Sequence, residues 1–153
     1  MDDDNDSRPL LFITTTKTCP ACTYFKLKIL PVLYAHTTKE KKIRIRIQNL
    51  EAWSEEERIK LDSHSPHIRS KIIEFPSLIL FDGESWNTGG DDCFIFNTDD
   101  KTKKLLSSES QLIMSPENII TWLTDKLRIL EQRKTPTSIN SSVSKISFRS
   151  SWR

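Results

Sequence analysis

Hydrophobic and polar positions alternate or cluster along this chain in patterns that predict several short strands. Residues 10–15 form an apolar and β-branched run, which predicts a buried strand. Residues 42–48 alternate basic and apolar side chains, which predicts a strand with one buried face. Residues 75–83 predict a further apolar strand that ends in an Asp-Gly turn, with residues 93–96 as its antiparallel neighbour. The basic side chains of the second strand, which would form an exposed face or protect a sheet edge, are Lys42, Arg44 and Arg46.

Helical spacing of apolar positions predicts helices between and after these strands. Residues 21–35 carry one apolar face, within which Pro31 should kink or end the helix. Residues 51–62 are mostly charged, and Ser54 before three glutamates predicts a capped helix start. The Ser-Pro pair at 115–116 predicts the start of a closing helix. The apolar face of that helix consists of Ile119, Ile120, Trp122, Leu123, Leu127 and Leu130.

Length and charge distribution predict one domain with a tail at each end. The chain has 153 residues, enough for a single hydrophobic core. We expect an acidic, disordered N-terminus over residues 1–8, a domain over 9–133 and a disordered, basic Ser/Thr-rich tail over 134–153. Basic and aromatic residues in the tail could attract nucleic acid or an acidic partner, but a solubilising role is the preferred interpretation.

Membrane insertion and secretion are not expected from the sequence. No segment reaches the roughly 18 uninterrupted apolar residues that a membrane-spanning helix needs. The acidic start also lacks the basic and apolar segments of a secretory signal. We therefore expect a cytoplasmic location, or a virion if the chain is viral, and a monomer.

Two cysteines separated by two residues stand where the first strand meets the first helix, in the segment Cys19-Pro20-Ala21-Cys22. At a helix start, unpaired amides and the helix dipole stabilise negative charge, so Cys19 can act as a thiolate nucleophile. Cys22 lies one turn further along and can form a disulfide with it. Pro20 suits the first turn because its fixed φ is helical and its missing amide costs nothing there. Lys17 is either a further stabilising charge or an ordinary solvated lysine.

Other interpretations of the cysteines stay open from the residues alone. The pair could be half of a zinc site, or two inert buried thiols. Redox chemistry is preferred, because the pair stands where a strand meets a helix and the other candidate ligands lie far apart in the sequence. We expect Cys93 to be a core thiol, and His64 and His67 to be solvated loop residues. The other candidate zinc ligands are His36, His64, His67 and Cys93.

The segment Lys-Thr-Cys-Pro-Ala-Cys at 17–22 resembles a glutaredoxin active site within the thioredoxin and glutaredoxin superfamily. The pair Phe75-Pro76, at a predicted strand start, is similar to the superfamily's cis-proline loop. The resemblance implies a three-layer α/β, thioredoxin-like fold with a central mixed four-stranded sheet flanked by helices. It also implies that Pro76 faces Cys19 and that the backbone of Phe75 receives a substrate chain or glutathione. The implied site thus combines the catalytic Cys19 and Cys22 with the substrate-binding Lys17, Pro20, Phe75 and Pro76.

By this resemblance, the chain would be a thiol–disulfide oxidoreductase that reduces or exchanges protein disulfides in cell redox homeostasis. Glutathione is a candidate co-substrate, and no other cofactor and no metal is expected. Gly89-Gly90-Asp91-Asp92 is similar to the element that holds the amino end of glutathione in glutaredoxins. A strand follows it here, so an ordinary glycine turn is the preferred interpretation. The alternative function is a non-catalytic binding module whose basic strand and tail hold a protein or nucleic acid.

Overall fold

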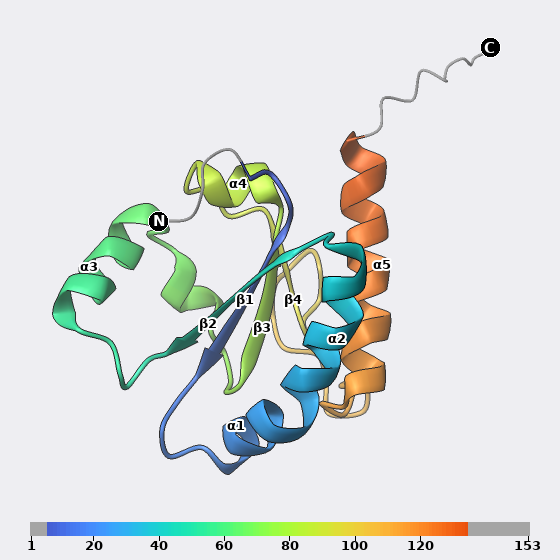
Figure 1. Cartoon of the computed structure of the whole chain (residues 1–153), viewed down its shortest axis with the longest axis horizontal. Helices are drawn as coiled ribbons and strands as arrows, with labels where there is room; N and C mark the ends of the chain where they lie inside the picture. Colours follow the sequence, from blue (N-terminus) through green and yellow to red (C-terminus); the bar gives the residue numbers. More distant parts are fainter. Residues whose placement is uncertain (1–5, 135–153) are drawn as a thin grey trace. The chain divides into compact units, whose positions relative to one another are not determined.

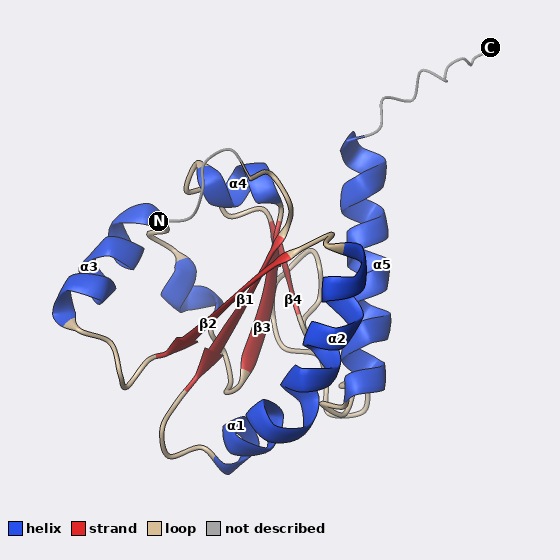
Figure 2. Ribbon diagram, in the orientation of Figure 1, coloured by secondary structure: helices blue, strands red, loops and turns tan. Residues whose placement is uncertain are grey.

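A four-stranded mixed sheet lies at the centre of the fold (Figure 2). The computed structural model describes residues 6–134. Across the sheet, the strands are β2 (Arg44–Asn49), β1 (Leu10–Thr15), β3 (Ser77–Phe81) and β4 (Cys93–Ile95). β2 is parallel to β1, whereas β3 is antiparallel to both β1 and β4. All four predicted strands are present, and the described chain is an α/β protein.

A helical segment crosses one face of the sheet to join the parallel strands β1 and β2 (Figure 1). It begins as α1 (Pro20–Tyr24), passes through the π-helical turn η1 (Phe25–Ile29) and continues as α2 (Leu30–Glu40). The residues it buries follow helical spacing, as predicted. They are Cys22, Phe25, Ile29 and Leu33.

The π-helical turn immediately precedes Pro31. Proline has no backbone N–H, and its ring would collide with a carbonyl one turn earlier in a regular α-helix. The N–H of Leu30 bonds to the carbonyl of Phe25, five residues earlier, which is π-helical spacing. The predicted interruption at Pro31 therefore takes the form of one widened turn, after which the helix continues.

Three helical elements cover the opposite face of the sheet: α3 (Glu55–His64), the 3-10 turn η2 (Ile68–Lys71) and α4 (Gly83–Asn87). The predicted cap of α3 is confirmed. The hydroxyl of Ser54 accepts the N–H of Glu57 at 3.1 Å, and the Glu57 carboxylate accepts the N–H of Ser54 at 3.3 Å. This reciprocal pair satisfies two amides that the helix itself cannot.

A hydrophobic cluster fills the space between these elements and the sheet. Its largest side chain is Trp86 of α4, whose ring centroid lies 5.8 Å from that of Phe12 and 5.1 Å from that of Phe81. Cys93 belongs to it, as predicted, and burial raises the pKa of its thiol. The buried members of this cluster are Leu10, Phe12, Leu61, Ile68, Ile79, Phe81, Trp86, Cys93 and Ile95.

Of the two alternatives for the basic residues, an exposed face is wrong for Arg44 and Arg46, whereas an edge strand is confirmed, because β2 lies at the edge of the sheet. In register, Arg44 and Arg46 pair with β1 residues of the hydrophobic cluster and share their side of the sheet. Arg44 is buried, and the guanidinium carbon of Arg46 lies 6.0 Å from the ring centroid of Trp86. Lys42 is exposed. The alternation of basic and apolar residues over 42–48 does not show which face of the strand is exposed, because helices lie on both faces of this sheet.

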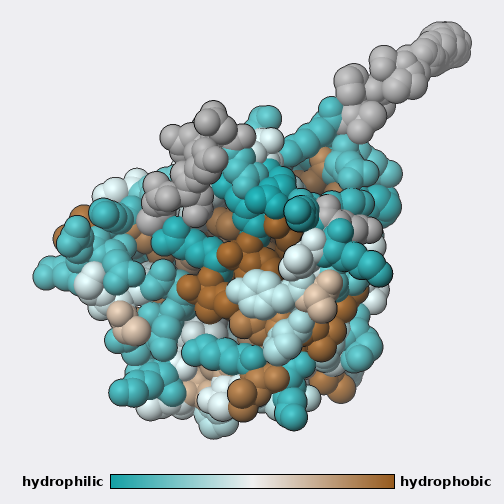
Figure 3. Space-filling model, viewed as in Figure 1, coloured by the Kyte–Doolittle hydropathy of each residue, from teal (hydrophilic) through white to brown (hydrophobic). Residues whose placement is uncertain are grey.

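The other face of β2 is incompletely covered. Ile45 and Ile47 pair with the buried Leu11 and Ile13 of β1, yet they remain half-buried. Figure 3 shows hydrophobic residues at the surface in the middle of the view, surrounded by hydrophilic ones. β2 is also an edge strand of the sheet, which leaves this side without a further strand.

Two expectations near α4 need correction. Asp82 and Gly83 do not form a hairpin turn, because Asp82 caps α4 and this helix intervenes before β4. His64 is not a solvated loop residue: it ends α3, and its Nε2 lies 2.6 Å from a backbone carbonyl of α4. His67 is exposed, as predicted. Gly89 has a φ of 76°, which a non-glycine residue rarely adopts, so the glycine-turn interpretation holds.

The N-terminal segment is positioned from residue 6, before the predicted domain start at residue 9. Asp6 and Arg8 form an ion pair with a 2.7 Å separation. The side-chain amide of Asn87 donates to the carbonyl of Asp6 at 2.9 Å. The expected disorder therefore does not extend over residues 6–8. The remainder of the predicted acidic N-terminus lies outside the described residues.

The predicted closing helix is α5 (Pro116–Lys134). The hydroxyl of Ser115 accepts the N–H of Asn118 at 3.2 Å, which provides the expected cap. Trp122 packs edge-on against Phe96, with 5.4 Å between ring centroids. No helix within residues 6–134 has both the length and the hydrophobicity of a membrane span.

By its contacts, the chain divides into two compact units, Met1–Leu123 and Thr124–Arg153, with the boundary inside α5. The first unit holds the sheet, the helical elements up to α4 and the first part of α5. The described part of the second unit is the rest of α5, in which Arg128 and Asp125 form an ion pair at 2.8 Å. The predicted basic tail lies outside the described residues, except for Lys134.

Candidate active site

The cysteine motif and the Phe75–Pro76 loop lie at the same end of the sheet, here called the cysteine end. The chain leaves β1 and the parallel β2 at this end, and it enters the antiparallel β3 there. The N–H of Leu50 bonds to the carbonyl of Thr15 at 2.9 Å, which joins the loops after β1 and β2. The buried hydroxyls of Thr14 and Ser77 are hydrogen bonded between β1 and β3. Sheet topology thus gathers three loops that are remote in sequence.

Cys19 is the N-cap of α1 and is half-exposed. Its sulfur accepts the N–H of Cys22 at 3.1 Å, and its carbonyl accepts the N–H groups of Cys22 and Thr23 at 3.1 Å each. An amide directed at the sulfur stabilises negative charge on it, since a charged acceptor forms the stronger hydrogen bond. The sulfur is therefore reachable from solvent and provided with a donor.

Cys22 differs from Cys19 in its surroundings. Only 1% of its surface is exposed. Burial raises the pKa of the Cys22 thiol and the hydrogen bond with Cys19 raises it further, while the backbone of Thr16 acts in the opposite direction. Of the two thiols, Cys22 is thus the one that solvent and large substrates do not reach.

The loop before β3 faces the Cys19 sulfur. The Phe75–Pro76 peptide bond is cis, and Pro76 is buried. The carbonyl oxygen of Phe75 lies 3.7 Å from Cys19 Sγ, where it can accept the thiol proton. The side chain of Phe75 is 38% exposed. Beside it, burial raises the pKa of the Glu74 carboxyl.

The remaining predicted site residues lie in the loop before α1 and in its first turn. Pro20 is the first residue of α1, directly after Cys19, and it is exposed. Lys17 is exposed and makes no hydrogen bond or ion pair with any residue that the structure describes. Its neighbour Thr18 donates to the Glu51 carboxylate at 3.4 Å, which links this loop to the segment before α3.

Gly89–Asp92 is not part of this site. The carbonyl of Asp92 accepts the N–H of Asp82, which follows the last residue of β3, at 3.1 Å. Pro76 precedes the first residue of β3. The Gly-Gly element therefore lies at the opposite end of the sheet from Cys19, and its similarity to a glutathione-binding element does not extend to its position.

The zinc interpretation finds no support among the described residues. Within residues 6–134, no group of three or more His, Cys, Asp or Glu side chains lies close enough together to hold a metal ion. Of the proposed additional ligands, His36 is exposed on α2, His64 bonds to α4 and Cys93 lies in the core. The interpretation as two inert buried thiols does not fit Cys19, whose side chain is half-exposed.

A groove of about 290 Å³ beside Phe75 was not predicted from the sequence. It is formed where the segments before α3, around η2 and before β3 meet. The only sequence signal for it was Trp53, an isolated aromatic residue in a charged stretch. The lining residues are Leu50, Trp53, Arg58, Arg69, Ile72 and Phe75.

Comparisons with known proteins do not place this chain in a family. No protein-family model matches it, and no match was found among curated proteins. The resemblance to the thioredoxin and glutaredoxin superfamily therefore rests on the cysteine motif and the Phe75–Pro76 loop. Function has to be inferred from the geometry of the cysteine end.

Proposed function

We propose that this chain is a thiol–disulfide oxidoreductase with a thioredoxin-like fold, in which Cys19 attacks a disulfide and Cys22 resolves the product. One observation carries the proposal: the half-exposed Cys19 sulfur accepts an amide N–H at 3.1 Å and lies 3.7 Å from the Phe75 carbonyl. The fold assignment is supported by a parallel strand–helix–strand unit followed by two antiparallel strands and a helix.

The first step is attack by the Cys19 thiolate on one sulfur of a substrate disulfide. A new bond forms between Cys19 Sγ and that sulfur, and the substrate S–S bond breaks. The second substrate sulfur leaves as a thiolate and takes a proton from solvent. The Cys22 amide stabilises the attacking charge, and the Phe75 carbonyl offers an acceptor to a substrate backbone N–H beside the reacting sulfur.

The second step releases the substrate. Cys22 attacks Cys19 Sγ and gives up its proton, which ends on the departing substrate sulfur, so that a Cys19–Cys22 disulfide forms and the mixed disulfide breaks. The first substrate sulfur leaves as a thiolate and is protonated. Overall, two electrons pass from the dithiol to the substrate, whose disulfide becomes two thiols. Burial of Cys22 makes this step intramolecular, because other disulfides cannot reach it.

Regeneration of the dithiol requires a thiol reductant. Two molecules of a low-molecular-weight thiol, such as glutathione, reduce the Cys19–Cys22 disulfide by the reverse chemistry. In a reducing compartment such as the cytoplasm the pair is held as the dithiol, so the protein acts as a reductase there. Equilibration of the pair with defined glutathione mixtures measures the reduction potential that sets this direction.

The test compares Cys19→Ser with the matched control Cys93→Ala, each in turnover of bis(2-hydroxyethyl) disulfide with a thiol reductant. Because serine cannot act as the sulfur nucleophile, Cys19→Ser should lower the rate about 1,000-fold or more. Cys93→Ala should keep the parent's rate, since Cys93 lies in the core away from the cysteine end. Equal rates for Cys19→Ser and the parent would refute the proposal.

The binding-module alternative depends on a basic strand and a basic tail. Arg44 is buried and hydrogen bonded, and Arg46 lies over Trp86, so two of the three basic side chains of that strand are already engaged. The tail lies outside the described residues. No observation in the described part of the chain favours this alternative.

A further inference from the structure

The groove beside Phe75 and the surroundings of the reactive sulfur share one residue. Phe75 contributes to both: its carbonyl contacts Cys19 Sγ, and its half-exposed side chain lines the groove. Leu50, also in the lining, bonds through its N–H to the last residue of β1. A polypeptide whose cysteine reacts with Cys19 therefore has the groove within reach of its neighbouring residues.

One of the lining residues, Trp53, has a buried hydrogen-bond donor that lacks a partner. The indole Nε1 of Trp53 is buried and makes no hydrogen bond in the structure. A buried donor without an acceptor costs about 1–3 kcal/mol, so an acceptor brought by a bound segment would remove that penalty. This group favours an occupant that carries an oxygen acceptor.

The charged side chains of the groove are both arginines. The guanidinium of Arg69 lies over the Trp53 ring, 5.5 Å from its centroid, and its Nε donates to Asp62 at 3.0 Å. Its two terminal nitrogens make no hydrogen bond with any described residue. Arg58 forms longer contacts, 3.6 Å to Glu55 and 4.0 Å to Asp62. The arginine fork of Arg69 is therefore held in place by one carboxylate and still presents N–H groups for another.

The rest of the lining is apolar, consisting of Leu50, Ile72 and the Phe75 ring. The volume of about 290 Å³ falls just below the roughly 300–1,000 Å³ that is usual for drug-sized ligands. The groove can therefore hold a side chain of a bound segment. Its chemistry combines an apolar wall, an indole donor and an arginine.

We infer that this groove selects disulfide-bonded polypeptides that carry an apolar side chain and a carboxylate within two positions of the reacting cysteine. The apolar side chain packs on Leu50, Ile72 and Phe75, while the carboxylate bonds to Arg69 and accepts from Trp53 Nε1. This inference rests on the proposed oxidoreductase function and adds the class of substrate. The proposed occupant is a peptide segment, because a substrate attached covalently to Cys19 holds its neighbouring residues beside Phe75, which lines the groove.

The test uses short synthetic peptides in which a single cysteine is joined to 2-nitro-5-thiobenzoate by a disulfide. One peptide has Phe and Asp on one side of the cysteine, and its partners replace Asp by Asn or Lys, or Phe by Ala. A second series places the same residues on the other side. The full-length parent protein is reduced beforehand, and release of the coloured thiolate in its single turnover gives the second-order rate constant that corresponds to kcat/KM for each peptide.

The Asp peptide of at least one series should exceed its Asn partner about tenfold and its Lys partner by more, as expected for one charge-assisted hydrogen bond. The advantage should shrink at high salt, because the groove is open to solvent. Arg69→Gln should reduce the Asp-over-Asn ratio to near one. Trp53→Phe, which keeps the ring but removes the N–H, should lower kcat/KM for the Asp peptide severalfold.

Lys60→Gln is the matched control for the loss of one positive charge on the same side of the molecule. Lys60 lies on α3, is exposed and pairs with Glu56 at 3.9 Å, and it does not line the groove. It should leave the Asp-over-Asn ratio unchanged. An equal fall of the ratio in Lys60→Gln and Arg69→Gln would show a general charge effect and overturn the inference.

Failure of the inference is distinguishable from failure of the proposed function. If the parent turns over bis(2-hydroxyethyl) disulfide in a Cys19-dependent manner but treats the Asp, Asn and Lys peptides alike in both series, the groove does not select substrates. If that small disulfide is not turned over at all, the oxidoreductase proposal itself is wrong. The peptide ratios of the parent decide the first point even if a groove variant fails to fold.

Discussion

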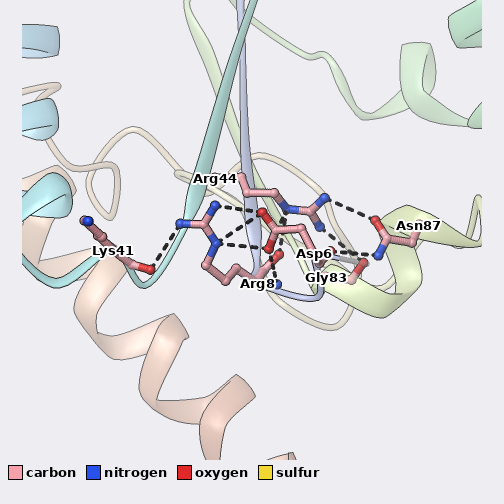
Figure 4. Close-up of polar contacts among 6 residues, drawn as sticks. All are labelled: Asp6, Arg8, Lys41, Arg44, Gly83 and Asn87. Carbon is pink, nitrogen blue, oxygen red and sulfur yellow. Dashed lines mark hydrogen bonds and ion pairs between the residues drawn. The ribbon is translucent and has the colours of Figure 1, made fainter. Parts of the chain in front are cut away.

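The two ends of the sheet contrast in how their polar groups are used. At the cysteine end, Cys19 is half-exposed, Lys17 is exposed without a described partner and Trp53 Nε1 has no acceptor. At the opposite end, polar side chains from three segments bond to one another (Figure 4). One end leaves donors and a sulfur ready for a ligand, whereas the other uses its donors within the fold.

Arg44 is the centre of the opposite end. Its Nε donates to the carbonyl of Arg8 at 3.0 Å and its Nη1 to the amide oxygen of Asn87 at 3.2 Å, with Asp6 as an ion-pair partner at 3.9 Å. Arg8 pairs with Asp6 as well and donates to the carbonyl of Lys41 at 3.2 Å. The network thereby ties the N-terminal segment, β2 and α4 together (Figure 4). A buried guanidinium is tolerated because its N–H groups find acceptors.

In this small domain, reactive groups lie at the cysteine end and stabilising polar contacts lie at the opposite end. A site needs groups whose hydrogen bonds are not all satisfied internally, and such groups weaken the fold locally. The strands β1, β2 and β3 run from one end of the sheet to the other, so each has one terminus at each end. Variants at the opposite end should therefore change stability and leave chemistry intact, and variants at the cysteine end should do the reverse.

After the Cys19→Ser variant described above, Cys22→Ser should have the largest effect at the cysteine end. Without the resolving thiol, Cys19 remains bound to substrate, so turnover falls about a hundredfold or more and a mixed disulfide accumulates. Intact mass measured under non-reducing conditions detects the adduct. The urea midpoint of unfolding should stay close to that of the parent. Continued multiple turnover without an adduct would contradict the division between the two thiols.

Gly83→Ala should have the largest effect on stability at the opposite end. A Cβ at this position would lie 2.0 Å from the carbonyl oxygen of Ser7 and 2.5 Å from that of Arg8, both backbone atoms. The resulting displacement should cost about 1–3 kcal/mol of unfolding free energy, measured by urea denaturation. Gly90→Ala is the milder control, since its closest neighbour is the movable Ser85 hydroxyl at 2.6 Å. Equal losses in both variants would argue against a backbone clash at Gly83.

Arg44→Leu should lower the unfolding free energy by about 2 kcal/mol. Several acceptors lose the guanidinium that donates to them, while leucine keeps the buried position filled with an apolar side chain. Disulfide turnover at temperatures where the variant is folded should match that of the parent. Lys42→Gln serves as the control, since exposed substitutions usually change stability by less than about 0.5 kcal/mol. A loss of turnover larger than the loss of folded protein would show that the opposite end also affects the chemistry at Cys19.

The smallest effect is expected from the pH dependence of the same network. The hydrogen bonds and charge of Arg8 lower the pKa of Asp6 from 3.8 to about 2. A lowered carboxyl pKa stabilises the folded state above pH 3.8, and this contribution is lost as the pH falls through about 2. Asp6→Asn should therefore be less stable than the parent at pH 6 by under about 1 kcal/mol, since the pair is partly solvated.

Thermal unfolding at pH 6, 4 and 2.5 measures this prediction. The difference between the parent and Asp6→Asn should shrink toward the lowest pH, because the parent's carboxyl begins to protonate there. A constant difference over this range would mean that the Asp6 charge does not contribute through the Arg8 pair.

Much of the fold followed from local sequence patterns. The strand at 10–15, the Ser54 capping box and the Ser115 cap were predictable because each depends on residues adjacent in the chain. The cysteine motif was predictable for the same reason. The burial of Arg44 was not predictable, since alternation shows which residues share a face of the strand but not what covers that face.

Short-range periodicity and capping residues were enough to predict the strands, the helix starts and the placement of Cys19 and Cys22 at a strand-to-helix junction. Three other relations became visible only once the chain was folded: the Phe75 carbonyl lies 3.7 Å from Cys19 Sγ, Gly89–Asp92 lies at the other end of the sheet, and Trp53 and Arg69 line one groove. These relations join residues far apart in sequence, and strand order and direction fix them through the sheet.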